Sequence, residues 1–175
     1  MANPTMTLIA TQTLGANTAS VTFSSIPSTY NDLKLVISSR TAAVGSAAAY
    51  AFSFNGDSAA NYSNTILSGN SSAALSGRAS SQSQDLSLVT SGAGSTASTF
   101  GASEIYISNY NSTGSKPFFD FDVSENNLAS AGAANAGACA HLYRGTSGIS
   151  SITVTPNSAY FFQYSDFYLY GIKNS

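Results

Sequence analysis

Apolar and polar residues alternate with a period of two along most of the chain, and no persistent stripe with the helical period of 3.6 residues is present. In the segment from Leu33 to Ile37, every second residue is Leu or Ile, and from Phe119 to Val123 Phe and Val alternate with Asp120 and Asp122. The β-branched and aromatic residues of such segments suit a pleated, half-buried surface. The pattern therefore predicts strands, with the apolar residues of each strand on one face.

The alternating segments predict about ten strands, separated by turns rich in Gly, Asn, Ser and Pro. The predicted ranges are Thr7 to Leu14, Ala19 to Phe23, Leu33 to Arg40, Tyr50 to Asn55, Tyr62 to Leu67, Asp85 to Val89, Glu104 to Asn109, Phe118 to Glu125, Ala138 to Tyr143, Ile149 to Thr155 and Phe167 to Ile172. Many short strands favour an all-β fold, a jelly-roll-like antiparallel β-sandwich, with a barrel as the alternative. We expect one such domain over residues 1–175, with a short N-terminal arm.

Three stretches rich in Ser, Gly and Ala interrupt the alternation: Thr41 to Ala49, Gly69 to Ser83, and Thr90 to Ser98. Small residues permit close packing against a partner, but they are also typical of mobile loops. The sequence leaves open an interface, a mobile loop and unrecognised secondary structure for these stretches.

Charged residues make up only 8% of the chain, with 6 cations, 8 carboxylates and a net charge of −2. Ser, Thr and Asn, about a third of the residues, supply the polarity instead. Duplex nucleic acid is disfavoured as a partner because phosphate binding needs several Lys or Arg residues. No segment reaches the roughly 18 apolar residues of a membrane span, and Met1 to Leu14 lacks the features of a signal peptide. A weakly charged surface favours association between copies.

Few residues offer chemistry. Cys139 is the one cysteine, which excludes an intrachain disulfide and favours a buried apolar thiol. His141 is the one histidine and is expected in a strand, where a structural role is favoured over a zinc ligand or a catalytic base. No enzyme activity, cofactor or metal is expected.

Asp120 and Asp122 are two residues apart on one face of a predicted strand, and Glu125 follows. The favoured interpretation is a solvated strand face. The alternatives are a cation site with oxygen ligands, an ion pair between subunits, or a pair of carboxylates that hydrolyse a polysaccharide.

Tyrosines cluster near the C-terminus and again around residue 106. Amphipathic tyrosine rings suit an interface with another molecule. Stacking on sugars is the alternative. The predicted interface residues are Tyr106, Tyr110, Tyr164, Tyr168 and Tyr170.

Short segments over nearly the full chain also carry a resemblance. They are Leu8-Ile9-Ala10 with Thr13-Leu14, Val21 to Pro27, Phe54-Asn55-Gly56-Asp57 with Asn61-Tyr62-Ser63, Glu104 to Ile107 with Asn109-Tyr110, Ser124-Glu125-Asn126-Asn127, and Phe167 to Ile172. In these segments the chain resembles small β-sandwich virion structural proteins of tailed bacteriophages, of the aquatic or cyanophage-like kind.

The resemblance implies a virion component made in the host cytoplasm, with no catalytic residues to carry over. We expect a capsid decoration or cement protein whose partners are the major capsid protein or other virion proteins. A homo-oligomer, with a trimer favoured, fits repeated subunit contacts on a shell. The alternative is a fibre or appendage domain that binds host surface glycans.

Overall fold

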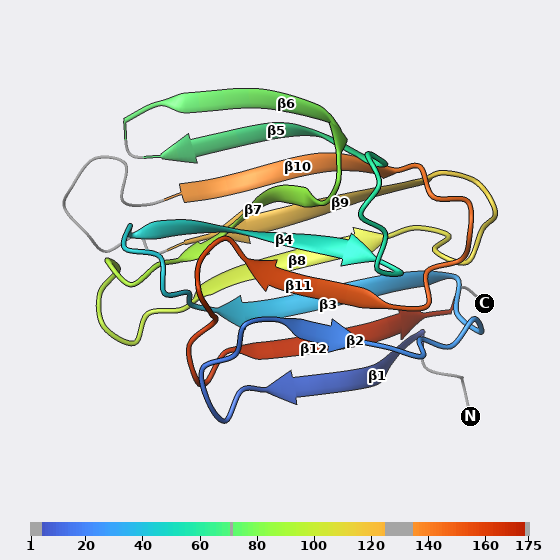
Figure 1. The fold of residues 1–175 in the computed structure, drawn as a ribbon, viewed down its shortest axis with the longest axis horizontal. Helices are drawn as coiled ribbons and strands as arrows, with labels where there is room; N and C mark the ends of the chain where they lie inside the picture. Colours follow the sequence, from blue (N-terminus) through green and yellow to red (C-terminus); the bar gives the residue numbers. More distant parts are fainter. Residues whose placement is uncertain (1–4, 71, 125–134, 174–175) are drawn as a thin grey trace.

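The chain forms a two-layered β-sandwich, seen here in a computed structural model that describes residues 5–70, 72–124 and 135–173 (Figure 1). One sheet has eight strands in the order β1-β12-β3-β8-β9-β10-β5-β6, and the other has four in the order β2-β11-β4-β7. Every pair of neighbouring strands is antiparallel. The described residues contain no helix, so none forms the long apolar helix that a membrane span would need.

The twelve strands are short, as the alternating pattern requires. Their bounds are β1 (Met6–Thr13), β2 (Val21–Phe23), β3 (Asp32–Ser39), β4 (Ala47–Phe54), β5 (Tyr62–Asn70), β6 (Ala74–Gln82), β7 (Asp85–Ser91), β8 (Gly101–Ile107), β9 (Lys116–Val123), β10 (Asn135–Tyr143), β11 (Ile152–Pro156) and β12 (Asp166–Ile172).

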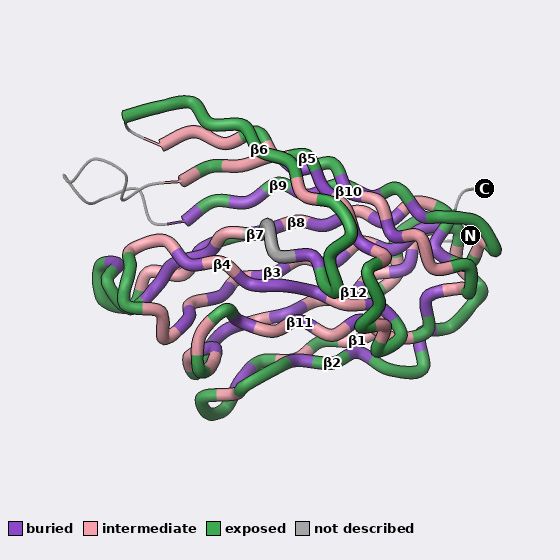
Figure 2. Tube along the Cα trace, turned by 45° about the horizontal axis from the view of Figure 1, so that its top comes forward, coloured by how far each residue is buried: buried purple, intermediate pink, exposed green. Residues whose placement is uncertain are grey.

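Inward-facing apolar residues of both sheets form the core. The large sheet contributes alternate residues of β3, β8 and β12, and the small sheet contributes those of β2, β4 and β11. The most buried include Leu33, Leu35, Ile37, Tyr50, Phe52, Phe54, Ile105, Val154, Phe167 and Leu169. The small sheet covers only part of the large one: its edge strand β7 packs against β5, β8, β9 and β10, and the outer strand β6 is almost wholly exposed (Figure 2).

The predicted all-β antiparallel sandwich is confirmed, and the strands are close to their predicted ranges. The chain crosses repeatedly between the sheets, as it would in a jelly roll, but sheets of eight and four strands replace two equal ones. The tight turn after β4 forms as its residues predict: Asn55 and Gly56 both have positive φ, and the Asp57 amide donates to the Phe54 carbonyl. The predicted N-terminal arm begins outside the described residues.

One of the three stretches rich in Ser, Gly and Ala contains a strand, which is one of the possibilities that the sequence left open. The stretch from Gly69 to Ser83 contains β6, which pairs along β5. Its sequence, ALSGRASSQ, lacks the β-branched and aromatic residues that usually mark a strand, because both of its faces are largely exposed and no core selects them. The stretch at Thr41 to Ala49 likewise holds the first residues of β4.

Strand β9 corrects a prediction. Asp120 and Asp122 were expected on a solvated face, but they face the core, whereas Phe119 and Phe121 face outward. Buried and exposed residues alternate strictly along this strand (Figure 2). The period of two was correct and the assignment of its faces was wrong, since alternation separates two faces without saying which is inside.

Candidate functional site

The inward faces of β9 and β10 hold a cluster of buried ionisable side chains. His141 on β10 lies between two carboxylates: its Nδ1 is 2.6 Å from Asp85 Oδ2, and its Nε2 is 2.6 Å from Asp120 Oδ2. All three side chains are fully buried. Phe118 stacks on the imidazole at 4.5 Å between ring centroids with an interplanar angle of 4°. The packing and both ion pairs therefore fix the plane of the ring.

Two carboxylates facing the two ring nitrogens favour the doubly protonated imidazolium. Burial lowers the pKa of His141, but the hydrogen bonds to Asp120 and Asp85 outweigh it and raise the pKa to about 11. Burial raises the pKa of Asp120, and His141 offsets part of that rise. A charged His141 donates both ring hydrogens, so the trio is a closed ion-pair network.

Asp122 lies beside this network but has no ion pair with His141. Its Oδ2 accepts a hydrogen bond of 2.8 Å from the Val89 amide of β7. Burial raises its pKa to about 7, and the nearby charge of Asp120 adds to the rise. Among the described residues, neither Asp122 Oδ1 nor Asp120 Oδ1 has a hydrogen-bond partner, although both atoms are buried. The backbone amide of Gly137 on β10 and the charge of His141 lower the pKa of Asp122, but they offset only part of the rise that burial causes.

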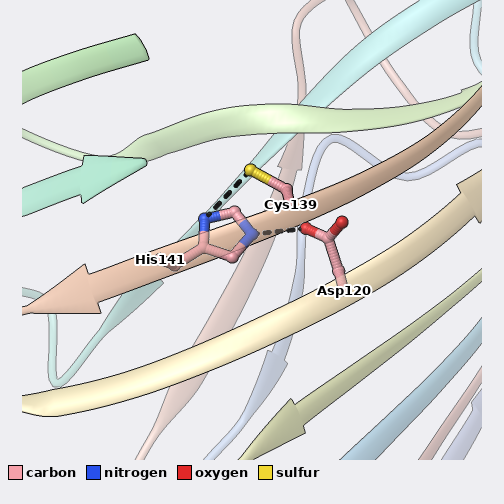
Figure 3. A group of neighbouring side chains, drawn as sticks. All are labelled: Asp120, Cys139 and His141. Atoms are coloured by element: carbon pink, nitrogen blue, oxygen red, sulfur yellow. Dashed lines mark hydrogen bonds and ion pairs between the residues drawn. The ribbon is translucent and has the colours of Figure 1, made fainter. Parts of the chain in front are cut away.

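Asp120, Cys139 and His141 are close enough to be considered as metal ligands (Figure 3). Cys139 Sγ, however, lies 3.7 Å from Nδ1, whereas Asp120 lies on Nε2 at the other side of the ring. A histidine ligates a metal through one nitrogen in the plane of its ring. These three residues therefore do not surround one point, and a metal bound to all three would need a different imidazole position.

The outer face of the large sheet is apolar in its middle. Strand pairing places Lys34, Tyr106, Phe119, Ala140 and Thr65 in one row across the sheet. The next row of outward residues contains Tyr168, Val36, Glu104, Phe121, Ala138 and Leu67. Tyr106 and Phe119 stack at 5.4 Å, and Phe121 packs edge-on against Phe119.

The outward aromatic residues of β9 form a ridge between two hollows. Phe121 is 56% exposed and Phe119 is 40% exposed. A hollow of about 250 Å³ lies on the β8 side of Phe121, and one of about 270 Å³ lies on its other side, against Ala138, Ala140 and Leu67. The alanines of β10 leave the second hollow open because they are too small to fill the space beside the phenylalanines. The outer face of the large sheet therefore has one aromatic ridge with a groove on each side.

The structure distributes the predicted interface tyrosines over three places. Tyr106, Tyr168 and Tyr170 face outward on the large sheet, at least partly exposed, and their interface role stays a prediction. Tyr164 is exposed on the loop before β12. Tyr110 is wholly buried, and its hydroxyl donates to the Pro27 carbonyl, so its ring is core and is not available to a neighbour in this fold.

The sequence analysis did not identify several residues of the buried cluster and of the outer face. Asp85, Asn64 and Lys116 were not singled out, although all three are buried; Asn64 Nδ2 donates to Asp85 Oδ1 at 2.9 Å. Phe119 and Phe121 were expected on the face opposite the solvated aspartates and were not considered as surface residues. Glu125, considered with Asp120 and Asp122, lies outside the described residues. A usable signal was the row Ala136, Ala138, Ala140, whose small outward side chains leave neighbouring rings uncovered.

Comparison with known proteins adds little. No family model matches the chain, and no curated protein matches it. Among solved structures, the chain is similar to the CBM2 module of the evolved Dit of Lactobacillus casei BL23 phage J-1. The two are 12% identical over 89% of this chain and 69% of that one, with a TM-score of 0.19. A likeness this distant carries no argument about fold or function.

Proposed function

We propose that this chain is a phage virion structural protein that docks on another virion protein through the outer face of its large sheet. The main observation that supports this function is the exposed ridge of Phe119 and Phe121, with a hollow on each side. Contiguous exposed aromatic surface is costly for a free protein and usually marks an interaction site. A ridge and grooves of this size can interlock with large apolar side chains of a neighbour.

A protein partner suits this face better than a sugar. Sugar binding needs free hydrogen-bonding groups around an aromatic ring, but on the β10 side the ridge is bordered by Ala138 and Ala140, with Leu67 beyond them. Three of the polar groups nearby are already engaged: Lys34 pairs with Glu104 at 2.7 Å, and the Tyr106 hydroxyl donates to Asp32 Oδ2. The buried cluster does not suit catalysis either, because its side chains have no exposure to a substrate. The proposal is therefore a binding role without enzyme activity.

The edges of the large sheet support assembly into repeated copies. Strand β1 carries no charged residue, and β6 carries only Arg78. Natural edge strands usually carry charges that prevent pairing with another chain. We propose that virion neighbours cover these edges, most specifically in a decoration or cement protein bound to the major capsid protein as a trimer. Many weak contacts repeated by symmetry would then hold it in place.

The test is rebinding of the purified chain to virus particles that lack it, measured by co-sedimentation. Phe121→Ser should weaken binding at least about tenfold, since a buried aromatic anchor is typically worth more than 1.4 kcal/mol. Val44→Ser is the matched control, because Val44 is 93% exposed on a loop outside this face and should bind as the wild type does. Equal binding of both variants, or wild-type particles that contain none of this protein, would overturn the proposal.

The second candidate is a fibre or appendage domain that binds host glycans through Tyr168 and Tyr170, which face outward on β12, separated from the ridge by β3 and β8. A glycan array separates the two candidates. Binding to a glycan that is lost in Tyr170→Ala and kept in Phe121→Ser would favour this second function. Particle binding without a glycan signal would reject it.

A further inference from the structure

A polar hollow of about 300 Å³ lies on the outer face of the large sheet, over β5, β6 and the end of β10. Arg78 of β6 and Arg144, the residue after β10, both line it. Strand pairing sets Arg78 opposite Thr65, so Arg78 extends the outward row that contains Phe119. The hollow also shares Thr65 and Ala140 with the groove beside the aromatic ridge. It is therefore continuous with the proposed docking face.

The two arginines approach this hollow from opposite sides. Arg78 lies in the row of Thr65 on β6, whereas the Arg144 amide donates to the Asn61 carbonyl, four residues back along β5 and two strands away from β6. Strand rise and strand spacing then put their Cα atoms about 16 Å apart. Ser63 of β5 lies between the two rows and also lines the hollow. The hollow is therefore placed so that one small anionic group can contact both guanidinium groups.

No carboxylate of the described residues forms an ion pair with either arginine of the hollow. Asp57, in the turn before β5, accepts hydrogen bonds from Asn61 and Tyr143 instead. Elsewhere in the chain, Lys34 pairs with Glu104, and the other side chains that carry a positive charge near the core donate to backbone carbonyls. The hollow thus brings together two of the six Lys and Arg residues of the chain without a negative charge to balance them.

Hydrogen-bond donors are also available in the hollow. Within the part of the chain that the structure describes, the Arg78 guanidinium and the hydroxyls of Ser63 and Thr65 make no hydrogen bond. Arg144 Nη2 donates to the Ala60 carbonyl, which holds this guanidinium at the end of β10 and leaves its other N–H groups available. An oxyanion in the hollow could therefore accept hydrogen bonds from charged and neutral donors together.

We propose that the hollow binds an Asp or Glu carboxylate of the virion protein that docks on the aromatic ridge. The proposal rests on the function proposed above and specifies the chemistry of the partner. A partner that covers the ridge also covers the adjoining hollow, and burying two unpaired cations there is costly unless the partner supplies a negative charge. The planar fork of an arginine matches the two oxygens of a carboxylate.

Co-sedimentation with virus particles that lack the chain tests the proposal. Arg78→Gln should weaken binding about tenfold, and Arg78→Glu should weaken it further, because it sets two carboxylates against each other. Both variants should keep the urea midpoint of the wild type, since Arg78 lies on the exposed strand β6. Lys173→Gln is the matched control, because it removes one positive charge at the end of β12, which β3, β8 and β9 separate from β10, and should bind as the wild type does.

The dependence on salt gives a second measurement. Binding of the wild type should weaken more steeply with rising salt than binding of Arg78→Gln, because the variant has lost one charge pair with the partner. The same slope for both proteins would overturn the proposal.

Failure of this inference can be told apart from failure of the proposed function. Full binding by Arg78→Gln while Phe121→Ser loses binding would overturn the carboxylate contact alone, and so would equal losses for Arg78→Gln and Arg78→Glu. Full binding by Phe121→Ser would contradict the docking face itself. An acidic glycan bound by the wild type and not by Arg78→Gln would also overturn the proposal, because the anion would then belong to a sugar.

Discussion

In a strand of a β-sandwich the inner face is usually apolar and the outer face polar, but the two faces of β9 show the reverse. The inward residues are Lys116, Phe118, Asp120 and Asp122, and the outward residues are Pro117, Phe119, Phe121 and Val123. Three of the four buried positions are ionisable, and two of the four exposed positions are phenylalanine. Neither face is explained by β9 alone, so each must be explained by what lies opposite it.

On the inner face, neighbouring strands supply the partners. His141 of β10 and Asp85 of β7 complete an ion network that makes buried carboxylates tolerable. On the outer face nothing in the described residues covers the phenylalanines, and we attribute their exposure to a partner molecule. One strand therefore carries part of a buried ion network on its inner face and the exposed phenylalanines of the proposed docking surface on its outer face.

The two largest effects are expected on the inner face, and the first comes from removing a carboxylate of the network. Asp120→Ala should lower the free energy of unfolding by about 3–5 kcal/mol, because it leaves His141 with one buried partner. Urea denaturation of wild type and variant measures this loss. A loss below about 1 kcal/mol would mean that the ion network contributes little to stability. It would contradict the view that this network stabilises the inner face of β9.

Most of the fold could be predicted from the sequence, since alternation locates strands wherever one face is packed. The segments around Leu35, Phe52 and Leu169 show this, because each has its apolar face on the core. Strand β6 could not be predicted this way, because it has no packed face to leave a pattern. Which strands are neighbours is also outside the reach of alternation, since pairing joins segments as distant as Leu35 and Leu169.

The candidate site was harder to predict than the fold. Asp120 and His141 are 21 residues apart, and Asp85 and His141 are 56 apart. They meet only because β10 pairs with β9 and β7 crosses over both. Without this pairing, the usual rule that charged residues are exposed assigns both faces of β9 in the wrong direction.

The second prediction concerns the stability cost of truncating Phe118, an apolar residue of the inner face. Phe118→Ala should cost about 3–5 kcal/mol in unfolding free energy, because the ring packs against Phe52 and Phe54 and stacks on His141. The variant also removes the support that fixes the imidazole plane. Unfolding in urea, with the slope compared between variants, measures it. A cost equal to that of an exposed phenylalanine would show that the inner face is not packed as described.

The third prediction concerns the dependence of stability on pH. Burial raises the pKa of Asp122 to about 7 from a usual value of 3.8, so the folded state holds a proton that the unfolded chain releases. The free energy of unfolding should therefore fall as pH rises from about 4 to about 7, by a few kcal/mol at most, and stay level above. Asp122→Asn removes this contribution, so the difference between wild type and variant isolates it. A difference that does not vary across this range, or that rises with pH, would contradict the burial of a carboxylate here.

The smallest effect on stability is expected on the outer face, one residue along from Phe118. Phe119→Ala removes a partly exposed ring whose described contacts are the stack on Tyr106 and the edge of Phe121, so it should cost no more than about 1.5 kcal/mol. Phe118→Ala should therefore cost at least about twice as much stability as Phe119→Ala. For binding to particles the order is reversed, and Phe119→Ala should have the larger effect. Phe119→Ala should weaken docking to particles, measured by co-sedimentation, while its urea midpoint stays close to that of the wild type. If Phe119→Ala instead destabilised the chain as much as Phe118→Ala, the outer ridge would be part of the folding core, and the case for a docking face would be lost.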